Sequence, residues 1–138
     1  MPAKDRYHDQ VKNALIKDGW TITQDPLTIR VGRKNLFIDL GAERIIAAER
    51  GTEKIAVEVK SFARPSTMKD LEEALGQCVL YSRLLARREP QRKVYLAVTD
   101  EVYESVFEEE AGQILIEDGL LSILTFDPEQ EKLVRWTH

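Results

Sequence analysis

The spacing of hydrophobic residues changes from a helical to an extended pattern within the first half of the chain. Apolar or small residues recur at helical spacing over residues 4–18, and Gly19 follows as a C-terminal stop, which predicts an amphipathic helix. The residues on either side of Gly51-Thr52 are expected to pair as a β-hairpin. Strand-like segments occupy residues 20–23, 27–31, 35–40, 43–50 and 53–59. The first half is therefore predicted to be a helix followed by a sheet.

A long amphipathic helix is predicted after the hairpin. Ser66 or Thr67, directly after Pro65, can cap a helix that extends to about Arg88. Its expected core stripe consists of Leu71, Ala74, Leu75, Cys78, Leu80, Tyr81, Leu84 and Leu85. This stripe would pack the helix against the rest of the domain.

The remaining segments complete an α/β pattern. Residues 93–99 are almost all apolar and are expected to form a central strand covered on both faces, as the β-α-β order requires. A helical stretch is expected within residues 101–118, and strands are expected at 121–126 and 132–136. We predict one α/β domain over residues 1–138, with a mixed central sheet flanked by helices.

Length and composition agree with a single folded domain. The chain has 138 residues, of which 43% are apolar and 32% charged, and this length can bury a substantial core. No apolar run approaches the roughly 20 residues that span a bilayer, and the N-terminus lacks the apolar stretch of a signal peptide. We therefore expect a cytoplasmic protein with no membrane segment.

The residue counts restrict any metal site to oxygen ligands. Cys78 is the only cysteine, and His8 and His138 are the only histidines, which excludes an intrachain disulfide framework and the usual Cys/His zinc sites. Carboxylates would then hold a metal, which favours Mg²⁺ or Mn²⁺. The net charge of -4 argues against coating of DNA by a basic surface, so any contact with DNA would be local.

Two charged residues interrupt the apolar segment IAVEVKSF at residues 55–62. Glu58 and Lys60 lie two residues apart on the predicted strand and must therefore share one face. Burial of an ionised side chain is costly unless it finds a partner or an ion, and a structural ion pair or a strand end in solvent would meet that need. A glutamate and a lysine that face a common cavity can also hold a divalent metal and steady a phosphate or an attacking water, as phosphodiester hydrolysis requires.

The hairpin register supplies a third member of this site. Pairing around the turn puts Ile45 opposite Glu58 and Glu43 opposite Lys60, so Glu43, Glu58 and Lys60 would converge on one face. A slip of one residue would turn Glu43 to the other face. Asp39 has the same parity and is the alternative acidic ligand.

This pattern resembles the PD-(D/E)xK, or restriction-endonuclease-like, superfamily, in which an acidic residue opens the second core strand and an E-x-K triplet ends the third. The corresponding residues here are Glu43 or Asp39 and the triplet at 58–60. Gln77 and Tyr81 match the Q-x-x-x-Y motif of RecB-like branches and share one helix face. The resemblance implies a restriction-endonuclease-like core and a bound metal. No Pro-Asp dipeptide precedes the hairpin, so the first acidic ligand stays open.

A second resemblance extends over nearly the whole chain. The segments KDRYHDQVKNALIKDGWTITQDPL, DLGAERIIAAERGTEKIAVEVKSF, LEEALGQCVLY and FDPEQEKLVRW are similar to the cyanobacterial XisH family, the fdxN element excision controlling factors. This resemblance implies a role in excision of a DNA element during heterocyst differentiation. It also implies two partners, a site-specific recombinase and a small XisI-like companion protein.

Three functions are consistent with these residues. In a metal-dependent DNA endonuclease, Glu58 with Glu43 or Asp39 would bind the metal, Lys60 would orient the water, Gln77 would position the site, and Tyr81 would pack behind it. His8 could point in from the first helix, although a lone histidine beside an apolar stripe is more often structural.

The other two functions involve no catalysis. A catalytically silent accessory would bind DNA or a protein partner on the same fold. Alternatively, function would lie on an edge strand such as the C-terminal one, with Trp136 exposed at its end, through pairing or homodimer formation.

Overall fold

The computed structural model describes residues 5–31, 36–39 and 45–137, and for residues 30, 31 and 36–39 it describes the backbone alone. Its elements, in chain order, are α1 (His8–Lys17), β1 (Thr21–Gln24), β2 (Thr28–Val31), β3 (Leu36–Asp39), β4 (Ile45–Arg50), β5 (Glu53–Val59), α2 (Thr67–Arg88), β6 (Arg92–Thr99), α3 (Asp100–Val102), the π-helix η1 (Tyr103–Phe107), α4 (Glu110–Glu117), β7 (Ile123–Asp127) and β8 (Lys132–Trp136).

A mixed six-stranded sheet forms the centre of the fold. Its strand order is β1-β4-β5-β6-β7-β8, and β6 lies between β5 and β7 as a central strand. The β5–β6 and β6–β7 pairs are parallel, and the other three pairs are antiparallel. The predicted hairpin is confirmed, since β4 and β5 pair with Ile45 opposite Glu58, and Gly51 adopts a left-handed φ of 61° in the turn. The strands β2 and β3, expected in the same sheet, instead form a separate antiparallel pair.

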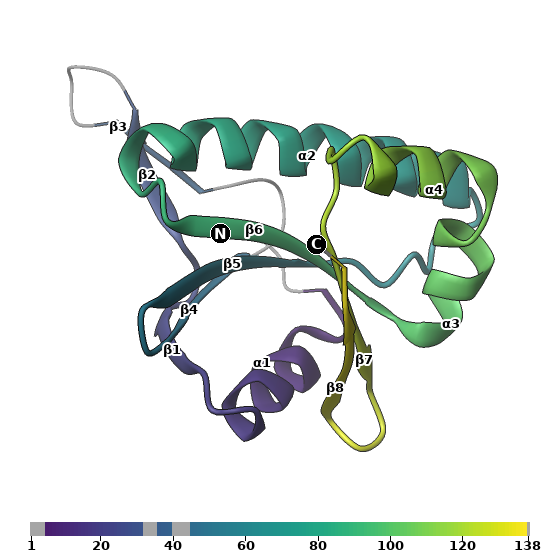
Figure 1. Ribbon diagram of the computed structural model, residues 1–138, viewed down its shortest axis with the longest axis horizontal. Helices are drawn as coiled ribbons and strands as arrows, with labels where there is room; N and C mark the ends of the chain where they lie inside the picture. The colour runs from purple at the N-terminus through teal and green to yellow at the C-terminus, as the bar shows by residue number, and fades with distance from the viewer. Residues whose placement is uncertain (1–4, 32–35, 40–44, 138) are drawn as a thin grey trace.

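Helices cover both faces of the central sheet. Figure 1 shows α2 and α4 along one face and α1 against the other. Successive residues of β5 face opposite sides of the sheet. Ala56 packs with Tyr81 and Leu85 of α2, whereas Val57 packs with Val11 of α1. None of the described helices is long and apolar enough to cross a membrane.

The helix α2 begins and ends where the sequence predicts. Ser66 is its N-cap and accepts a hydrogen bond from the Lys69 N–H at 3.2 Å. One residue of the expected core stripe was assigned wrongly, because Leu80 is 56% exposed. The helix contacts the sheet along one side only, and Leu80 lies outside that contact, whereas Tyr81 and Leu85 are buried.

The C-terminal strand also differs from the expectation. Trp136 was expected to be exposed at the end of β8. It is only half-buried and packs against two other aromatic rings, with centroid distances of 5.9 Å to Trp20 and 4.9 Å to Tyr95. The two Trp136 partners come from distant parts of the sequence, so the tertiary fold brings them together.

Candidate functional site

Glu58 and Lys60 lie at the carboxyl end of β5, on the face of the sheet that α2 covers. Glu58 is 0% exposed and Lys60 is 3% exposed, so neither charge reaches solvent. The Lys60 N–H donates to the Ala97 carbonyl at 3.1 Å and continues the parallel pairing with β6 beyond the last strand residue. The shared face inferred from their spacing therefore corresponds to the interface with α2.

The helix α2 supplies the partners of Lys60. The Lys60 ammonium donates to Glu73 Oε1 at 2.5 Å and to Gln77 Oε1 at 3.3 Å. Glu73 and Gln77 are one turn apart and so project from the same side of the helix. Gln77, predicted from the Q-x-x-x-Y spacing, thus contacts the predicted lysine directly.

Arg64 adds a second cation to this cluster. Its guanidinium donates to Glu73 Oε2 at 2.8 Å and to Asp70 Oδ1. Lys60 first, and Arg64 second, hold the pKa of Glu73 below its ordinary value. Glu73, and then Asp70, raise the pKa of Arg64 further. Lys60, Arg64, Asp70, Glu73 and Gln77 form what we call the Lys60 cluster, in which charges of both signs alternate.

A small cavity opens beside the Lys60 cluster. It has a volume of about 130 Å³ and is lined by residues of the β5–α2 connection, the start of α2 and Asp5. Asp5 joins the N-terminal segment to this site, because its carboxylate accepts hydrogen bonds from the N–H groups of Ser61 at 2.8 Å and Tyr7 at 2.9 Å. The site is thus a partly closed, charged recess at the carboxyl end of a central strand.

Cys78 shows how deeply the Glu58 side of the site is buried. Burial, with the nearby Glu58 charge as the next contribution, raises the pKa of the Cys78 thiol far above its ordinary value, while Lys60 acts in the opposite direction. Cys78 lies on α2, so Glu58 faces the same helix that holds Lys60. The thiol is protonated at neutral pH and is a packing residue in this position.

The described residues supply part of a metal site. No group of three His, Cys, Asp or Glu side chains that could hold a metal occurs within residues 5–31, 36–39 and 45–137. The predicted ligand Glu43 lies outside these residues, and Asp39 is described only through its backbone pairing with Thr28 in the β2–β3 hairpin. Glu58 is therefore the one predicted ligand whose surroundings are defined, and its oxygens are the donor type that Mg²⁺ prefers.

The other two predicted site residues have different surroundings. The Tyr81 ring is 1% exposed and packs in the apolar layer between α2 and the sheet. His8 is also 1% exposed, and its Nε2–H donates to the carboxylate of Asp25 at 3.0 Å, not to Glu58. Burial would raise the pKa of Asp25, but hydrogen bonds from His8 and Lys12 lower it overall. His8 thus belongs to a pair that links α1 to the β1–β2 connection.

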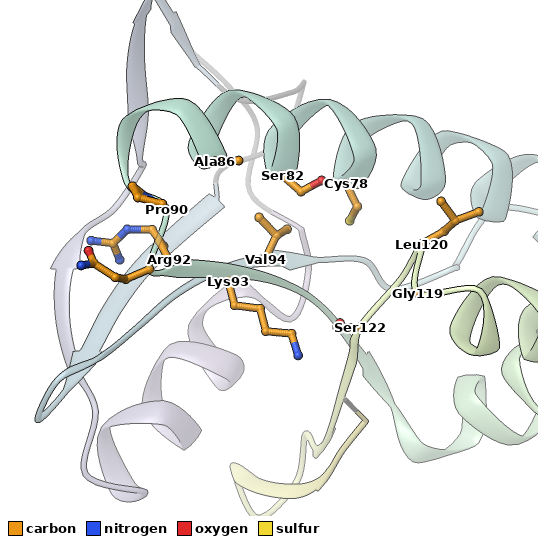
Figure 2. A pocket seen from close by; sticks show the side chains of 11 residues that line it. Cys78, Ser82, Ala86, Pro90, Arg92, Lys93, Val94, Gly119, Leu120 and Ser122 are labelled. Atoms are coloured by element: carbon orange, nitrogen blue, oxygen red, sulfur yellow. The ribbon is translucent and has the colours of Figure 1, made fainter.

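A larger cavity is lined in part by Cys78. It has a volume of about 400 Å³ and lies between α2, the start of β6 and the α4–β7 connection (Figure 2). Arg92, which lines it, is 6% exposed and donates to the Ile55 carbonyl at 2.8 Å and to Glu89 Oε1 at 3.0 Å. These hydrogen bonds connect the start of β6 to β5 and to the C-terminal end of α2, so Arg92 has a structural role.

Three members of the site were not predicted from the sequence. Asp70 and Glu73 lie near the start of a helix, where acidic residues are favourable anyway, and Arg64 lies in the β5–α2 connection. One signal does exist, because Glu73 and Gln77 follow each other at a spacing of four on the helix after E-x-K. A lysine at the end of the preceding strand can contact both.

The fold and the site define an α/β protein with a mixed six-stranded sheet and a buried Glu-Lys pair beneath its longest helix. The family described as XisH protein matches residues 1–134, and the chain belongs to this family.

Solved structures agree with this assignment. The chain is similar to an XisH family protein from Nostoc punctiforme PCC 73102, with 44% identity, a TM-score of 0.85, and coverage of 97% of this chain and 100% of that one. It is also similar to a fdxN element excision controlling factor protein from Anabaena variabilis, with 41% identity, a TM-score of 0.85, and coverage of 96% and 98% of the two chains. No protein of curated function matches it.

Proposed function

We propose that this protein is a metal-dependent DNA endonuclease with a PD-(D/E)xK, restriction-endonuclease-like core that acts in excision of a DNA element. The main support is the position of Glu58 and Lys60, which are both buried on one face at the carboxyl end of a central strand. A fold that needed only a hydrophobic layer there would place apolar residues at these two positions, because burial of charge is costly. The excision context comes from the name of the similar protein from Anabaena variabilis.

The residues of this site would divide the work of hydrolysis. Glu58, with Glu43 or Asp39, would bind Mg²⁺ or Mn²⁺, and the metal would polarise the scissile phosphate and lower the pKa of its water. Lys60 would orient the attacking water or offset the charge that develops on the phosphate. Gln77 holds the Lys60 ammonium in place at 3.3 Å.

One observation favours a second function, that of a catalytically silent accessory which binds DNA or a protein partner. The Lys60 ammonium already has a carboxylate partner at 2.5 Å, and Arg64 binds the same carboxylate. In such a network the carboxylates and the cations neutralise one another, so the network needs no ligand. Its role can then be purely structural, which is to hold α2 on the sheet. In this function, a site-specific recombinase would break and rejoin the strands, and a XisI-like protein would act with the present chain.

The test is cleavage of plasmid, single-stranded and branched DNA with Mg²⁺ or Mn²⁺, with and without the XisI-like partner. We expect the wild type to cut and Glu58→Gln and Lys60→Ala to be inactive. The matched controls are Glu49→Gln and Lys54→Ala, which change a glutamate and a lysine that pair at 3.6 Å on the same hairpin but at its exposed end. Circular dichroism would establish that all four variants are folded.

The outcomes separate the two functions. Loss of cutting in the Glu58 and Lys60 variants, with cutting retained in both controls, would support the endonuclease. Absence of cutting under every condition, together with absence of metal binding by calorimetry, would contradict it and leave the accessory function. If the wild type cuts DNA, Asp39→Asn and Glu43→Gln, tested in the same assay, would identify the first acidic ligand.

A further inference from the structure

Three aromatic residues from distant parts of the chain meet at one end of the sheet. Trp20 precedes β1, Tyr95 lies on β6 and Trp136 ends β8. Both tryptophans of the chain are therefore at this place. The Tyr95 and Trp136 rings are 4.9 Å apart at 83°, and the Trp20 and Trp136 rings are 5.9 Å apart at 37°. We call these three residues the aromatic corner.

A cavity of about 250 Å³ opens at the aromatic corner. Its walls are the three rings together with Arg50, Glu53 and Ile55. Trp20 and Tyr95 are almost fully buried, at 3% and 5% exposure, and they form a fixed base, whereas Trp136 is half-buried and offers ring surface to the cavity. Flat aromatic walls with a few polar groups at the rim suit a planar ligand of the size of one base.

Cations already occupy positions over two of the rings. The Arg50 guanidinium lies 4.4 Å from the Trp20 ring centroid, and the Lys93 ammonium lies 5.1 Å from the Tyr95 centroid. Figure 2 shows Lys93 on the side of β6 away from Val94, which faces α2. The Arg50 guanidinium is also paired with Asp18 at 2.8 Å and with Glu53 at 3.7 Å, so the rim carries charges of both signs. A planar group attached to a negative charge can stack on the rings and pair with Lys93 at this rim.

The charge distribution along the chain points to the same kind of ligand. Residues 94–131 contain eleven Asp or Glu and no Lys or Arg, whereas the other 100 residues contain 20 basic and 13 acidic residues. Arg50 and Lys93 belong to this basic remainder. A polyanionic strand that reaches the aromatic corner would therefore meet Lys93 and Arg50, and its continuation would avoid the acidic residues of segment 94–131.

We propose that the aromatic corner binds an unpaired nucleobase of a single-stranded nucleic acid, with Arg50 and Lys93 close to the adjoining phosphates. Stacking of bases on aromatic side chains beside a basic rim is the general mode of single-strand recognition. The site is separate from the Lys60 cluster, because Ile55 and Glu58 face opposite sides of β5, and Ile55 lies five residues, or about 16 Å, before Lys60. This inference does not depend on nuclease activity.

The experiment uses the two tryptophans as its probe. Oligo-dT, oligo-U and a DNA duplex of the same length would be titrated into the wild-type protein without metal, with tryptophan fluorescence as the readout. We expect saturable quenching by the single strands and much weaker quenching by the duplex, because paired bases cannot enter the cavity. Equal quenching by oligo-dT and oligo-U would show that binding requires neither the 2′-hydroxyl nor the thymine methyl group, and oligo-dU would separate these two groups if one oligomer is preferred.

Variants place the binding at the aromatic corner. The affinity of each variant for labelled oligo-dT would be measured by fluorescence anisotropy. Trp136→Leu should bind at least about tenfold more weakly than the wild type, as expected for loss of one stacking ring. Lys93→Ala should weaken binding and reduce its salt dependence. The matched control is Arg83→Ala, which removes an exposed cation from α2, the helix on the other face of the sheet. Urea unfolding would establish that Trp136→Leu is folded.

Several results would overturn the assignment. They are the absence of quenching by single strands, equal quenching by duplex and single strand, unchanged affinity in folded Trp136→Leu, or quenching by tetramethylammonium with none by oligonucleotide. Glu58→Gln distinguishes this inference from the proposed function, since it should abolish cleavage and leave quenching unchanged. A protein that never cuts DNA but shows the expected quenching would refute the endonuclease alone.

Discussion

Glu73→Gln removes one negative charge from the middle of the Lys60 cluster and keeps the shape of the side chain. The Glu73 carboxylate accepts from Lys60 at 2.5 Å and from Arg64 at 2.8 Å, so two cations lose a charged partner in the variant. The Lys60 side chain is only 4% exposed and cannot regain that partner from water. We therefore expect Glu73→Gln to lower the free energy of unfolding at neutral pH.

The size of this loss follows from the exposure of the two pairs. Arg64 and Glu73 are 54% and 38% exposed, so solvent screens their pair and it adds little to stability. In the Lys60–Glu73 pair only Lys60 is buried, so this pair contributes less than the roughly 1.5–3 kcal/mol of a fully buried charge-assisted hydrogen bond. Because glutamine can still accept a hydrogen bond, the expected loss is about 1–2 kcal/mol, or about 3–7 °C in Tm for a domain of this size.

The pH dependence gives the prediction its sign. Lys60 first, and Arg64 second, lower the pKa of Glu73 in the folded protein, so the unfolded state binds its proton at a higher pH. The stabilisation is complete above the ordinary glutamate pKa of about 4.5 and is lost as the pH falls through the lowered folded value. The difference between wild type and Glu73→Gln is therefore largest near pH 7 and shrinks progressively below pH 4.5.

Urea unfolding at several pH values, followed by circular dichroism, measures this difference. Glu72→Gln is the matched control, because Glu72 is the neighbouring residue on α2 and is exposed to solvent. The reasoning would be refuted by an equal loss of stability in Glu72→Gln. It would also be refuted by a Glu73→Gln deficit as large in acid as at pH 7.

Three further predictions concern packing around α2 and α4. Gly112→Ala would place its Cβ 2.5 Å from backbone atoms of η1 and should lower the free energy of unfolding by about 1–3 kcal/mol. In Gly76→Ala the new Cβ meets nothing within 4 Å, so this variant should stabilise α2 by about 0.5–1 kcal/mol. Thermal unfolding compares the two variants. Leu85→Ala, at a 0% exposed position, should cost about 2–5 kcal/mol in urea unfolding, and Leu80→Ala, at 56% exposure, should change stability by less than about 0.5 kcal/mol. Burial raises the pKa of Cys78, so its thiol should react with a disulfide reagent only after denaturation; rapid reaction of the folded protein would contradict this burial.

Local patterns were sufficient to predict most elements of the fold. The positions of α2 and of the β4–β5 hairpin follow from a capping serine, a left-handed glycine in the turn, and hydrophobic spacing, which all act within a few residues. The membership of β2 and β3 could not be predicted in this way. Strand pairing depends on contacts between segments far apart in the chain, and the short segments that form this separate pair have the same alternating pattern as sheet strands.

The candidate site was only partly predictable for the same reason. The parity of Glu58 and Lys60 and the four-residue spacing of Gln77 and Tyr81 are local features, and the fold places three of these four residues at or beside one cluster. Arg64 enters the cluster through the course of the β5–α2 connection, which no sequence period describes. Long-range placement of this kind requires the tertiary structure.

The two functional proposals differ in what they require of Glu73. In the endonuclease, Lys60 must be available to a phosphate or a water, and Glu73 competes for it, while Arg64 offers Glu73 an alternative partner at 2.8 Å. Loss of the Glu73 charge should then retain or increase the rate of cleavage per folded molecule, even though it destabilises the protein. In the silent accessory, the same change affects stability alone. Cleavage that disappears in folded Glu73→Gln but persists in Glu72→Gln would contradict this division of roles and make Glu73 itself part of the reaction.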